Sequence, residues 1–182
     1  CTRPKIREAL LEAAANLEPT ELSYGMSLAG FGVNRRRDSD RGYSCKSFPQ
    51  MVDHDVPVLT ARDSSGKLRS VLFGYACHTT SLCGTDINGD YAGYACREIE
   101  STFPGVQTMF LAGCGADINP LPRFTPQLSQ AYGMILAAAV REGIESPLRT
   151  LSGVLRGAAR RIPLETLPAP SLDEVTETLR TA

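Results

Sequence analysis

The sequence predicts an α/β domain with a mixed β-sheet and helices packed on its faces. Residues 56–77 form two apolar stretches around the turn DSSGK, which predicts a β-hairpin. The second stretch becomes apolar on both faces near its end, as expected of a central strand. Helix-like and strand-like stretches then alternate, which favours an α/β fold. With 182 residues, 42% of them hydrophobic, the chain can build one sizeable core.

Three segments precede the hairpin. Residues 4–17 carry apolar side chains at three- and four-residue spacing, with Pro4 suited to the first turn and Pro19 after the end, which predicts a helix. Residues 21–33 are expected to be extended and interrupted by glycines. Residues 34–42 are expected to form a charged loop.

Two helices and two strands are predicted after the hairpin. Asp90 is suited to cap a helix over residues 91–103, and a buried strand follows at 106–112. A long helix is expected from residue 125 to about 143, and a further strand over 151–165. The apolar positions of the two helices are Tyr91, Ala95, Ile99 and Phe103 in the first, and Leu128, Ala131, Ile135 and Ala138 in the second.

Two parts of unequal size are expected, an α/β domain over residues 1–162 and a proline-containing linker with a short helix over 163–182. Ser171 and Glu174 have the spacing of a capping box for that helix. A formal net charge of -1 gives no basis for binding nucleic acid or an anionic membrane surface. No apolar run approaches the roughly 20 residues of a membrane span. Because the first residue is Cys1, we expect a trimmed chain or a fragment.

Chemistry is expected where two buried strands end. The stretch VLFGYACHTTS leads into one helix and TMFLAGCGADINP into the next. Ligands of α/β sheets bind where strands end and helices begin, so His78 and the turn 113–120 are predicted to face one crevice. His78 has three interpretations from position alone: a core histidine with satisfied nitrogens, a metal ligand or a general base.

Several interpretations of the neighbouring residues stay open at this point. Asp90 is either an N-cap only or also an acceptor that orients the His78 ring. Cys114 could be a nucleophile paired with His78, although AGCGA is not a nucleophile elbow. Cys77, His78 and Cys83 could hold a structural zinc, although a fourth ligand is not evident. Arginines of the 34–41 loop are either solvated or recognise a carbonyl or an anion.

Four motifs in order resemble the N-terminal catalytic domain of the neutral, non-lysosomal ceramidase family, most closely its bacterial members. They are GFGVNRR, VDHDVPVLTARDSSGKLRSVLFGYACHTTSL, NGDYAGYACREIE and MFLAGCGADINP, and the similarity runs from about residue 22 to 160. The resemblance implies a partial catalytic domain of a zinc-dependent amide hydrolase that cleaves N-acylsphingosine or another N-acyl compound. It also favours a secreted or periplasmic location.

The resemblance also assigns roles to particular residues. His78 corresponds to one of two zinc histidines, and Arg35 to an arginine that polarises the substrate carbonyl. Asn119 stands where the family has its nucleophilic serine. Five further residues are expected to contact substrate or to support those that do: Asn34, Thr79, Ser81, Asp90 and Asp117.

The chain also departs from the family pattern. A carboxamide cannot replace a hydroxyl nucleophile, so with Asn119 we expect a zinc-bound water to attack directly while Asn119 orients it or donates to the oxyanion. The other zinc histidine of the family lies upstream of the Asn-Arg motif. The family's glutamate and tyrosine ligands belong to the region that follows the equivalent of about residue 160 in this chain. This chain therefore supplies one of four expected ligands, and His54, which matches none, is expected at the surface. The competing hypotheses are a non-catalytic relative that binds lipid or a partner, and an unrelated cysteine hydrolase.

Overall fold

A computed structural model describes residues 2–35, 51–154, 156–165 and 168–181 of the chain. It contains two compact units, Cys1–Ser152 and Gly153–Ala182. The sheet of the first unit extends no further than Leu151.

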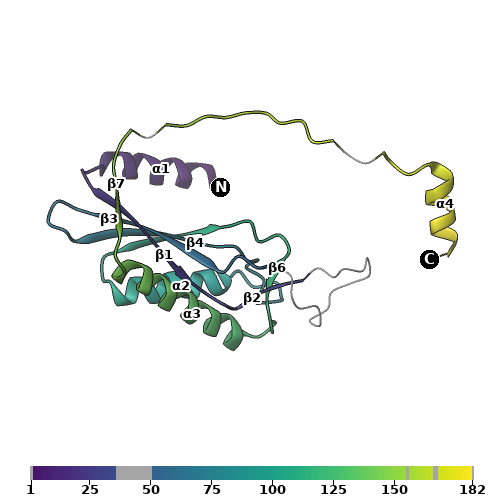
Figure 1. Cartoon of the computed structure of the whole chain (residues 1–182), viewed down its shortest axis with the longest axis horizontal. Coiled ribbons are helices and arrows are strands. Elements are labelled where there is room, and N and C mark those ends of the chain that lie inside the picture. The colour runs from purple at the N-terminus through teal and green to yellow at the C-terminus, as the bar shows by residue number, and fades with distance from the viewer. Residues whose placement is uncertain (1, 36–50, 155, 166–167, 182) are drawn as a thin grey trace. The chain divides into compact units, whose positions relative to one another are not determined.

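The first unit is built on a five-stranded sheet with the order β5-β4-β3-β1-β7 (Figure 1). Pairing is antiparallel except between β4 and β5, which run parallel, so the predicted mixed sheet and α/β class are confirmed. The hairpin turn between β3 and β4 is closed by Asp63 Oδ1, which accepts hydrogen bonds from the backbone of Ser65 and Lys67. The strands are β1 (Glu21–Leu28), β3 (Asp55–Arg62), β4 (Leu68–Tyr75), β5 (Gln107–Ala112) and β7 (Arg149–Leu151).

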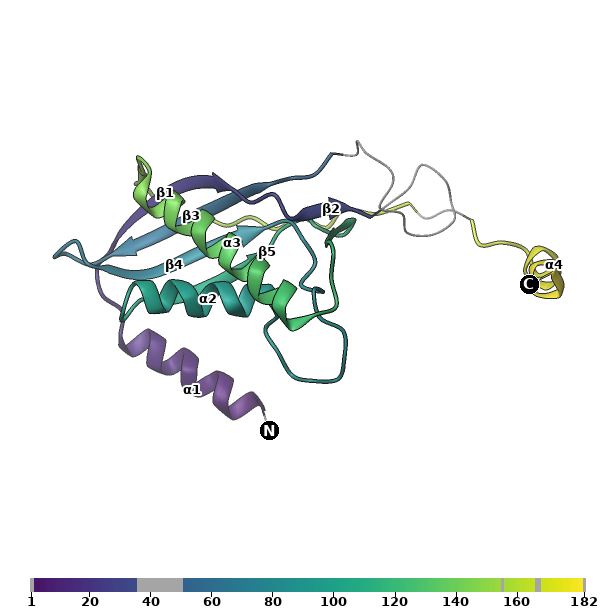
Figure 2. The same ribbon diagram turned by 90° about the horizontal axis from the view of Figure 1, so that it is seen from below.

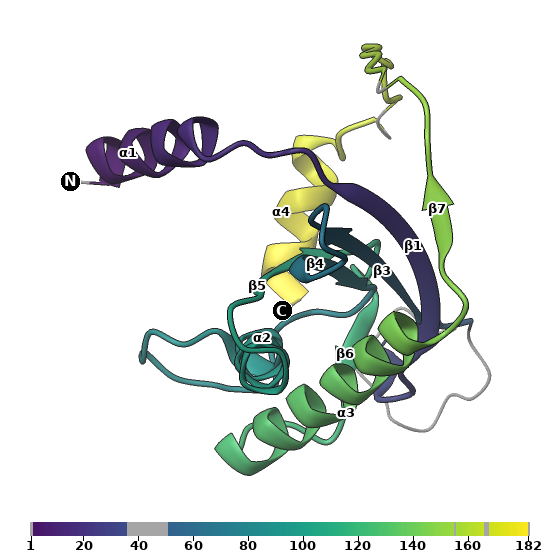
Figure 3. The same ribbon diagram turned by 90° about the vertical axis from the view of Figure 1, so that its left-hand side faces the viewer.

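Two helices, α2 (Asp90–Thr102) and α3 (Pro126–Glu145), cover one face of this sheet (Figures 2 and 3). The two helices approach so closely that a Cβ added at Gly133 would lie 2.3 Å from Tyr94 Cβ. Such a contact admits only glycine. The core between sheet and helices is formed by side chains that are almost fully buried, among them Val56, Val58, Phe73, Tyr75, Tyr91, Ile99, Leu136 and Val140.

The buried face of α2 is the predicted one, but that of α3 is not. Tyr91, Ala95 and Ile99 are buried, whereas Ile135 on α3 is exposed and Leu136 is fully buried. The reason is that α3 packs on the sheet and on α2 through small residues. Its buried set includes Ser129, Gly133, Ala137, Ala139 and Gly143, which a stripe of large apolar residues does not reveal.

A separate two-stranded sheet pairs β2 (Gly32–Asn34) with β6 (Ile118–Pro120). The sequence indicated extended chain in the first of these and a polar turn in the second. The strand predicted over 151–165 is wrong beyond Leu151, because the described residues that follow have no neighbouring strand with which to pair.

The two terminal helices are close to those predicted. Helix α1 (Thr2–Ala15) leaves its apolar side chains, such as Leu10, exposed. Helix α4 (Leu172–Thr181) begins with the predicted capping box, because the Ser171 backbone N–H donates to Glu174 and the Glu174 N–H donates to Ser171 Oγ. Within the described ranges no helix has the length and apolar character needed to cross a membrane.

Candidate functional site

The end of β4 lies directly against the turn that follows β5. The backbone N–H of Gly113 donates to Tyr75 O over 3.0 Å, and that of His78 donates to Ile118 O over 3.0 Å. A Cβ at Gly115 would lie 2.4 Å from the carbonyl carbon of Ala76, so only glycine fits there. The two strand ends that the sequence placed at one crevice are therefore side by side.

Arg35 and His78 converge on one backbone oxygen. Arg35 Nη2 lies 2.9 Å from Ala116 O, and His78 Nε2 lies 3.1 Å from the same atom. Because a carbonyl oxygen can only accept, this contact requires the hydrogen of a neutral His78 on Nε2 and leaves the lone pair on Nδ1. Arg35, His78 and Ala116 are far apart in the sequence, and hydrogen bonds to the Ala116 carbonyl oxygen bring the two side chains together.

The pairing of β2 with β6 positions the remaining predicted polar groups. Asn34 Nδ2 donates to Asp117 Oδ2 over 2.8 Å, and the Arg35 N–H donates to Asp117 O over 2.7 Å. Asn119 is paired with Val33 across the two strands and is only 2% exposed. Its Oδ1 is buried and has no hydrogen-bond partner in the part of the chain that the structure describes. A buried acceptor without a partner is costly, so this oxygen is a candidate position for a water molecule or a substrate N–H.

Asp90 is not the N-cap that the sequence predicted, and no hydrogen bond joins its carboxylate to His78 among the described residues. Its carboxylate accepts from the backbone of Ser81, Leu82 and Tyr91 and from Ser81 Oγ, at distances between 2.5 and 3.2 Å. Helix α2 begins at Asp90 itself, with Gly89 at the cap position and no side-chain cap. The hydrogen bonds between Asp90 and Ser81 therefore tie together the two ends of the loop that connects His78 to α2.

Thr79 and the second histidine, His54, lie away from the contacts around Ala116 O. Thr79 is exposed, and its neighbour Thr80 accepts a long hydrogen bond from Arg123. His54 is half-buried rather than at the surface, with a buried Nδ1 that has no hydrogen-bond partner among the described residues. No contact joins His54 to His78 within those residues.

The cysteines give little support to the alternatives based on them. Burial raises the pKa of the Cys77 thiol to about 12, so it stays a protonated packing residue. Cys83 and Cys114 are exposed. Among the residues that the structure describes, no group of three or more His, Cys, Asp or Glu side chains could hold a metal ion, which counts against a structural zinc at Cys77, His78 and Cys83.

Sequence reasoning missed two groups that build the site. Ala116 contributes through its carbonyl, which has no side-chain signal, although the adjacent glycines indicated close backbone approach. Tyr75 fixes the start of β2, because its hydroxyl donates to Ala29 O over 2.7 Å and accepts from the Gly32 N–H over 3.0 Å. Burial raises the pKa of Tyr75 to about 12, so the hydroxyl remains a donor. A tyrosine at the end of a buried strand was the available signal.

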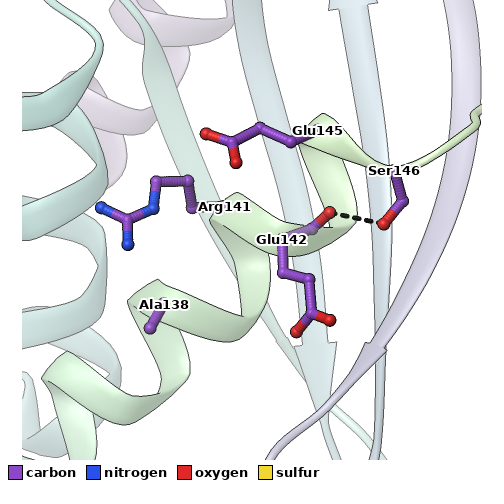
Figure 4. Close-up of a pocket in the computed structure, with 5 residues that line it drawn as sticks. All are labelled: Ala138, Arg141, Glu142, Glu145 and Ser146. Atoms are coloured by element: carbon purple, nitrogen blue, oxygen red, sulfur yellow. Dashed lines mark hydrogen bonds between the residues drawn. The ribbon is translucent and has the colours of Figure 1, made fainter.

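A pocket elsewhere on the surface contains none of these residues. It lies along the last turns of α3 (Figure 4), where Ser146 Oγ donates to Glu142 O over 2.7 Å. Its lining comes from one helix and the residue that follows it: Ala138, Arg141, Glu142, Glu145 and Ser146. It offers no arrangement of groups suited to catalysis.

Comparisons with known proteins find similarity in structure only. No family model and no curated protein matches the sequence. A crystal structure of neutral ceramidase from Pseudomonas aeruginosa matches 81% of this chain with a TM-score of 0.65 and 21% sequence identity. A ceramidase complexed with C2 matches 79% of it with the same TM-score and identity. The chain spans about a quarter of the length of these proteins, 26% and 25%. Its fold is therefore similar to that of part of a neutral ceramidase.

Proposed function

We propose that this chain supplies one side of the active site of a zinc-dependent hydrolase that cleaves N-acyl amides, with a ceramide-like lipid as the substrate class. The observation that carries the proposal is the hydrogen bond from His78 Nε2 to Ala116 O. Metal-binding histidines commonly donate their second ring N–H to a backbone carbonyl, which fixes the ring and presents the other nitrogen. The similarity of the fold to neutral ceramidases supports the same assignment.

The zinc site is not complete within the described residues. They offer one suitably held imidazole, and no cluster of three or more candidate ligands. Catalytic zinc needs three protein ligands, so the others must come from outside this set. We therefore derive no reaction step through the metal, and assign to this chain the positioning of one ligand and the binding of substrate.

The remaining roles follow from the hydrogen-bonding groups that surround His78. The Arg35 guanidinium, half-buried and tethered to Ala116 O, is suited to polarise the carbonyl of a scissile amide. The side-chain contact between Asn34 and Asp117 holds the end of β2, directly before this arginine, against the residue that precedes β6. Asn119 Oδ1 is suited to accept a hydrogen bond from the attacking water.

The test compares the two histidines in a longer protein that carries this chain and the missing ligands. His78→Ala should reduce bound zinc, measured by elemental analysis, and should reduce hydrolysis of a fluorogenic ceramide analogue at least about a hundredfold. His54→Ala is the matched control and should leave both nearly unchanged. Full zinc content and turnover in the His78 variant would overturn the proposal.

A second candidate function is a non-catalytic domain that binds lipid or a partner. It is favoured by one observation, the carboxamide of Asn119 at the position of the family's serine. If the hydrolase proposal holds, Asn119→Ala should lower turnover about tenfold or more without loss of zinc. Zinc-free protein that still binds ceramide-containing vesicles would favour the second function. A large gain of activity in Asn119→Ser would instead favour a serine route.

A further inference from the structure

The peptide group that joins Cys77 to His78 is held at both of its polar atoms. Its N–H donates to Ile118 O over 3.0 Å, and its carbonyl oxygen accepts from the Tyr91 hydroxyl over 2.7 Å. The two contacts come from different elements, β6 on one side and α2 on the other. A peptide group is planar, so contacts at both atoms leave it little freedom to rotate. The backbone that carries the His78 ring is therefore fixed between the two-stranded sheet and a helix.

The hydroxyl is what distinguishes Tyr91 from a phenylalanine at this place in the core. The residue is fully buried, and its ring centre lies 5.1 Å from that of Phe31 and 6.0 Å from that of Phe110, edge to face in both cases. A phenylalanine would make the same ring contacts. A buried hydroxyl costs free energy unless it is hydrogen-bonded, and this one donates to the Cys77 carbonyl. Burial raises the pKa of Tyr91, so the hydroxyl keeps the proton that it donates.

We propose that Tyr91 is a positioning residue for His78, because its hydroxyl holds the Cys77–His78 peptide and so sets the direction in which the imidazole points. The inference rests on the proposed function, in which this imidazole is a zinc ligand. Asp90, the residue before Tyr91, accepts from the backbone of Ser81 on the other side of His78. The first turn of α2 therefore holds the chain both before and after His78. Groups that fix the orientation of a metal ligand are part of how the metal is bound.

The ring contact of His78 depends on the position of this backbone. His78 Nε2 lies 3.1 Å from Ala116 O, and a hydrogen bond weakens steeply when its distance and angle change. Without the Tyr91 hydroxyl, the Cys77 carbonyl loses this donor and the peptide gains freedom to rotate. We then expect the ring to leave Ala116 O for part of the time and to adopt more than one rotamer.

The experiment observes His78 by NMR in the metal-free chain of 182 residues, so its outcome does not depend on zinc. In Tyr91→Phe the His78 amide should exchange with solvent at least about tenfold faster. The Gly113 amide, which donates to Tyr75 O at the same strand end, should change less than about threefold. Three-bond couplings from the backbone to the imidazole Cγ should report one χ1 rotamer in the original chain and averaging in the variant. His54 is the internal reference and should keep its couplings.

Tyr132→Phe is the matched control. The Tyr132 ring also packs on Phe31, at 4.8 Å between ring centres, and its hydroxyl also donates to a backbone carbonyl, that of Pro122. Both variants keep the ring and lose one hydrogen bond, so both should stay folded with similar losses of stability. Only Tyr91→Phe should change the amide exchange and the rotamer of His78. Equal effects of the two substitutions on His78, or no effect of Tyr91→Phe, would overturn the inference.

A second measurement separates this inference from the proposed function. In the longer protein that carries the missing ligands, Tyr91→Phe should weaken zinc binding at least about tenfold, and Tyr132→Phe less than about threefold. If His78→Ala abolishes zinc binding and Tyr91→Phe leaves it intact, the inference fails and the function stands. If neither substitution affects zinc while Tyr91→Phe still frees the His78 ring, the zinc role fails and the positioning by Tyr91 is retained.

Discussion

Substitution of Asp90 tests whether one buried carboxylate holds the loop between His78 and α2. The side chain is 6% exposed and accepts four hydrogen bonds, three of them at Oδ1 and one, from Leu82, at Oδ2. In Asp90→Asn an amide oxygen can keep the first three as neutral bonds, while the amide nitrogen faces the Leu82 N–H. Hydrogen bonds to a charged group contribute about 1.5 to 3 kcal/mol, and an abandoned buried donor costs about 1 to 3 kcal/mol. We therefore expect a loss of roughly 3 kcal/mol in the free energy of unfolding.

The backbone at Asp90 adds a second, separable effect. Its φ is 50°, in the left-handed region that disfavours residues with a Cβ. Asp90→Ala removes every acceptor and keeps that strain, whereas Asp90→Gly removes the acceptors and relieves it. The glycine variant should therefore be about 1 kcal/mol more stable than the alanine variant.

Urea unfolding followed by circular dichroism measures these differences. With a slope of about 2 kcal/mol per molar urea, the Asp90→Asn midpoint should fall by roughly 1.5 M. Asp86→Asn, an exposed aspartate in the same loop, is the control and should stay within about 0.5 kcal/mol of the original chain. If Asp90→Asn also stayed within that margin, the carboxylate would not hold the loop and the reasoning would be refuted.

Three further predictions concern the site and the two units. Gly115→Ala should lower the unfolding free energy by about 2 to 4 kcal/mol, measured by urea unfolding, because the added Cβ would clash with the backbone. Gly30→Ala is the control and should be nearly neutral, because a Cβ there has no neighbouring atom within 4 Å. Equal losses in the two variants would contradict this prediction. Iodoacetamide at pH 8 should modify exposed Cys114 and spare native Cys77, whose raised pKa of about 12 leaves almost no thiolate, as peptide mass spectrometry can check. In α4, hydrogen bonds from Ser171 lower the pKa of Glu174 below 4.5. The part of the helicity that these bonds support should therefore be full above pH 4.5 and should be lost as the pH falls through the lowered pKa. An isolated α4 peptide whose circular dichroism does not change with pH would exclude this.

Much of the order of elements is local and could be predicted from the sequence. The hairpin around DSSGK, the four-residue stripe of α2 and the capping box of α4 each depend on residues close together in the chain. His78 at the end of a buried strand was also identifiable as a candidate, because strand ends in α/β sheets bind ligands. Its zinc role and its missing ligands remain a proposal.

Only the tertiary structure decided how the distant parts meet. Arg35 and His78 share Ala116 O because the β2–β6 pair sets the turn against the end of β4, and a backbone carbonyl leaves no trace in residue type. The buried face of α3 was set by small residues that allow close packing, against the larger side chains that suggested another face. The Asp90 carboxylate accepts hydrogen bonds from Ser81 and Leu82, nine and eight residues earlier in the chain, and none from His78 among the described residues. In each case the contacting residue is too distant in the sequence for helix periodicity or a capping motif to indicate it. Its identity therefore depends on how the whole chain packs.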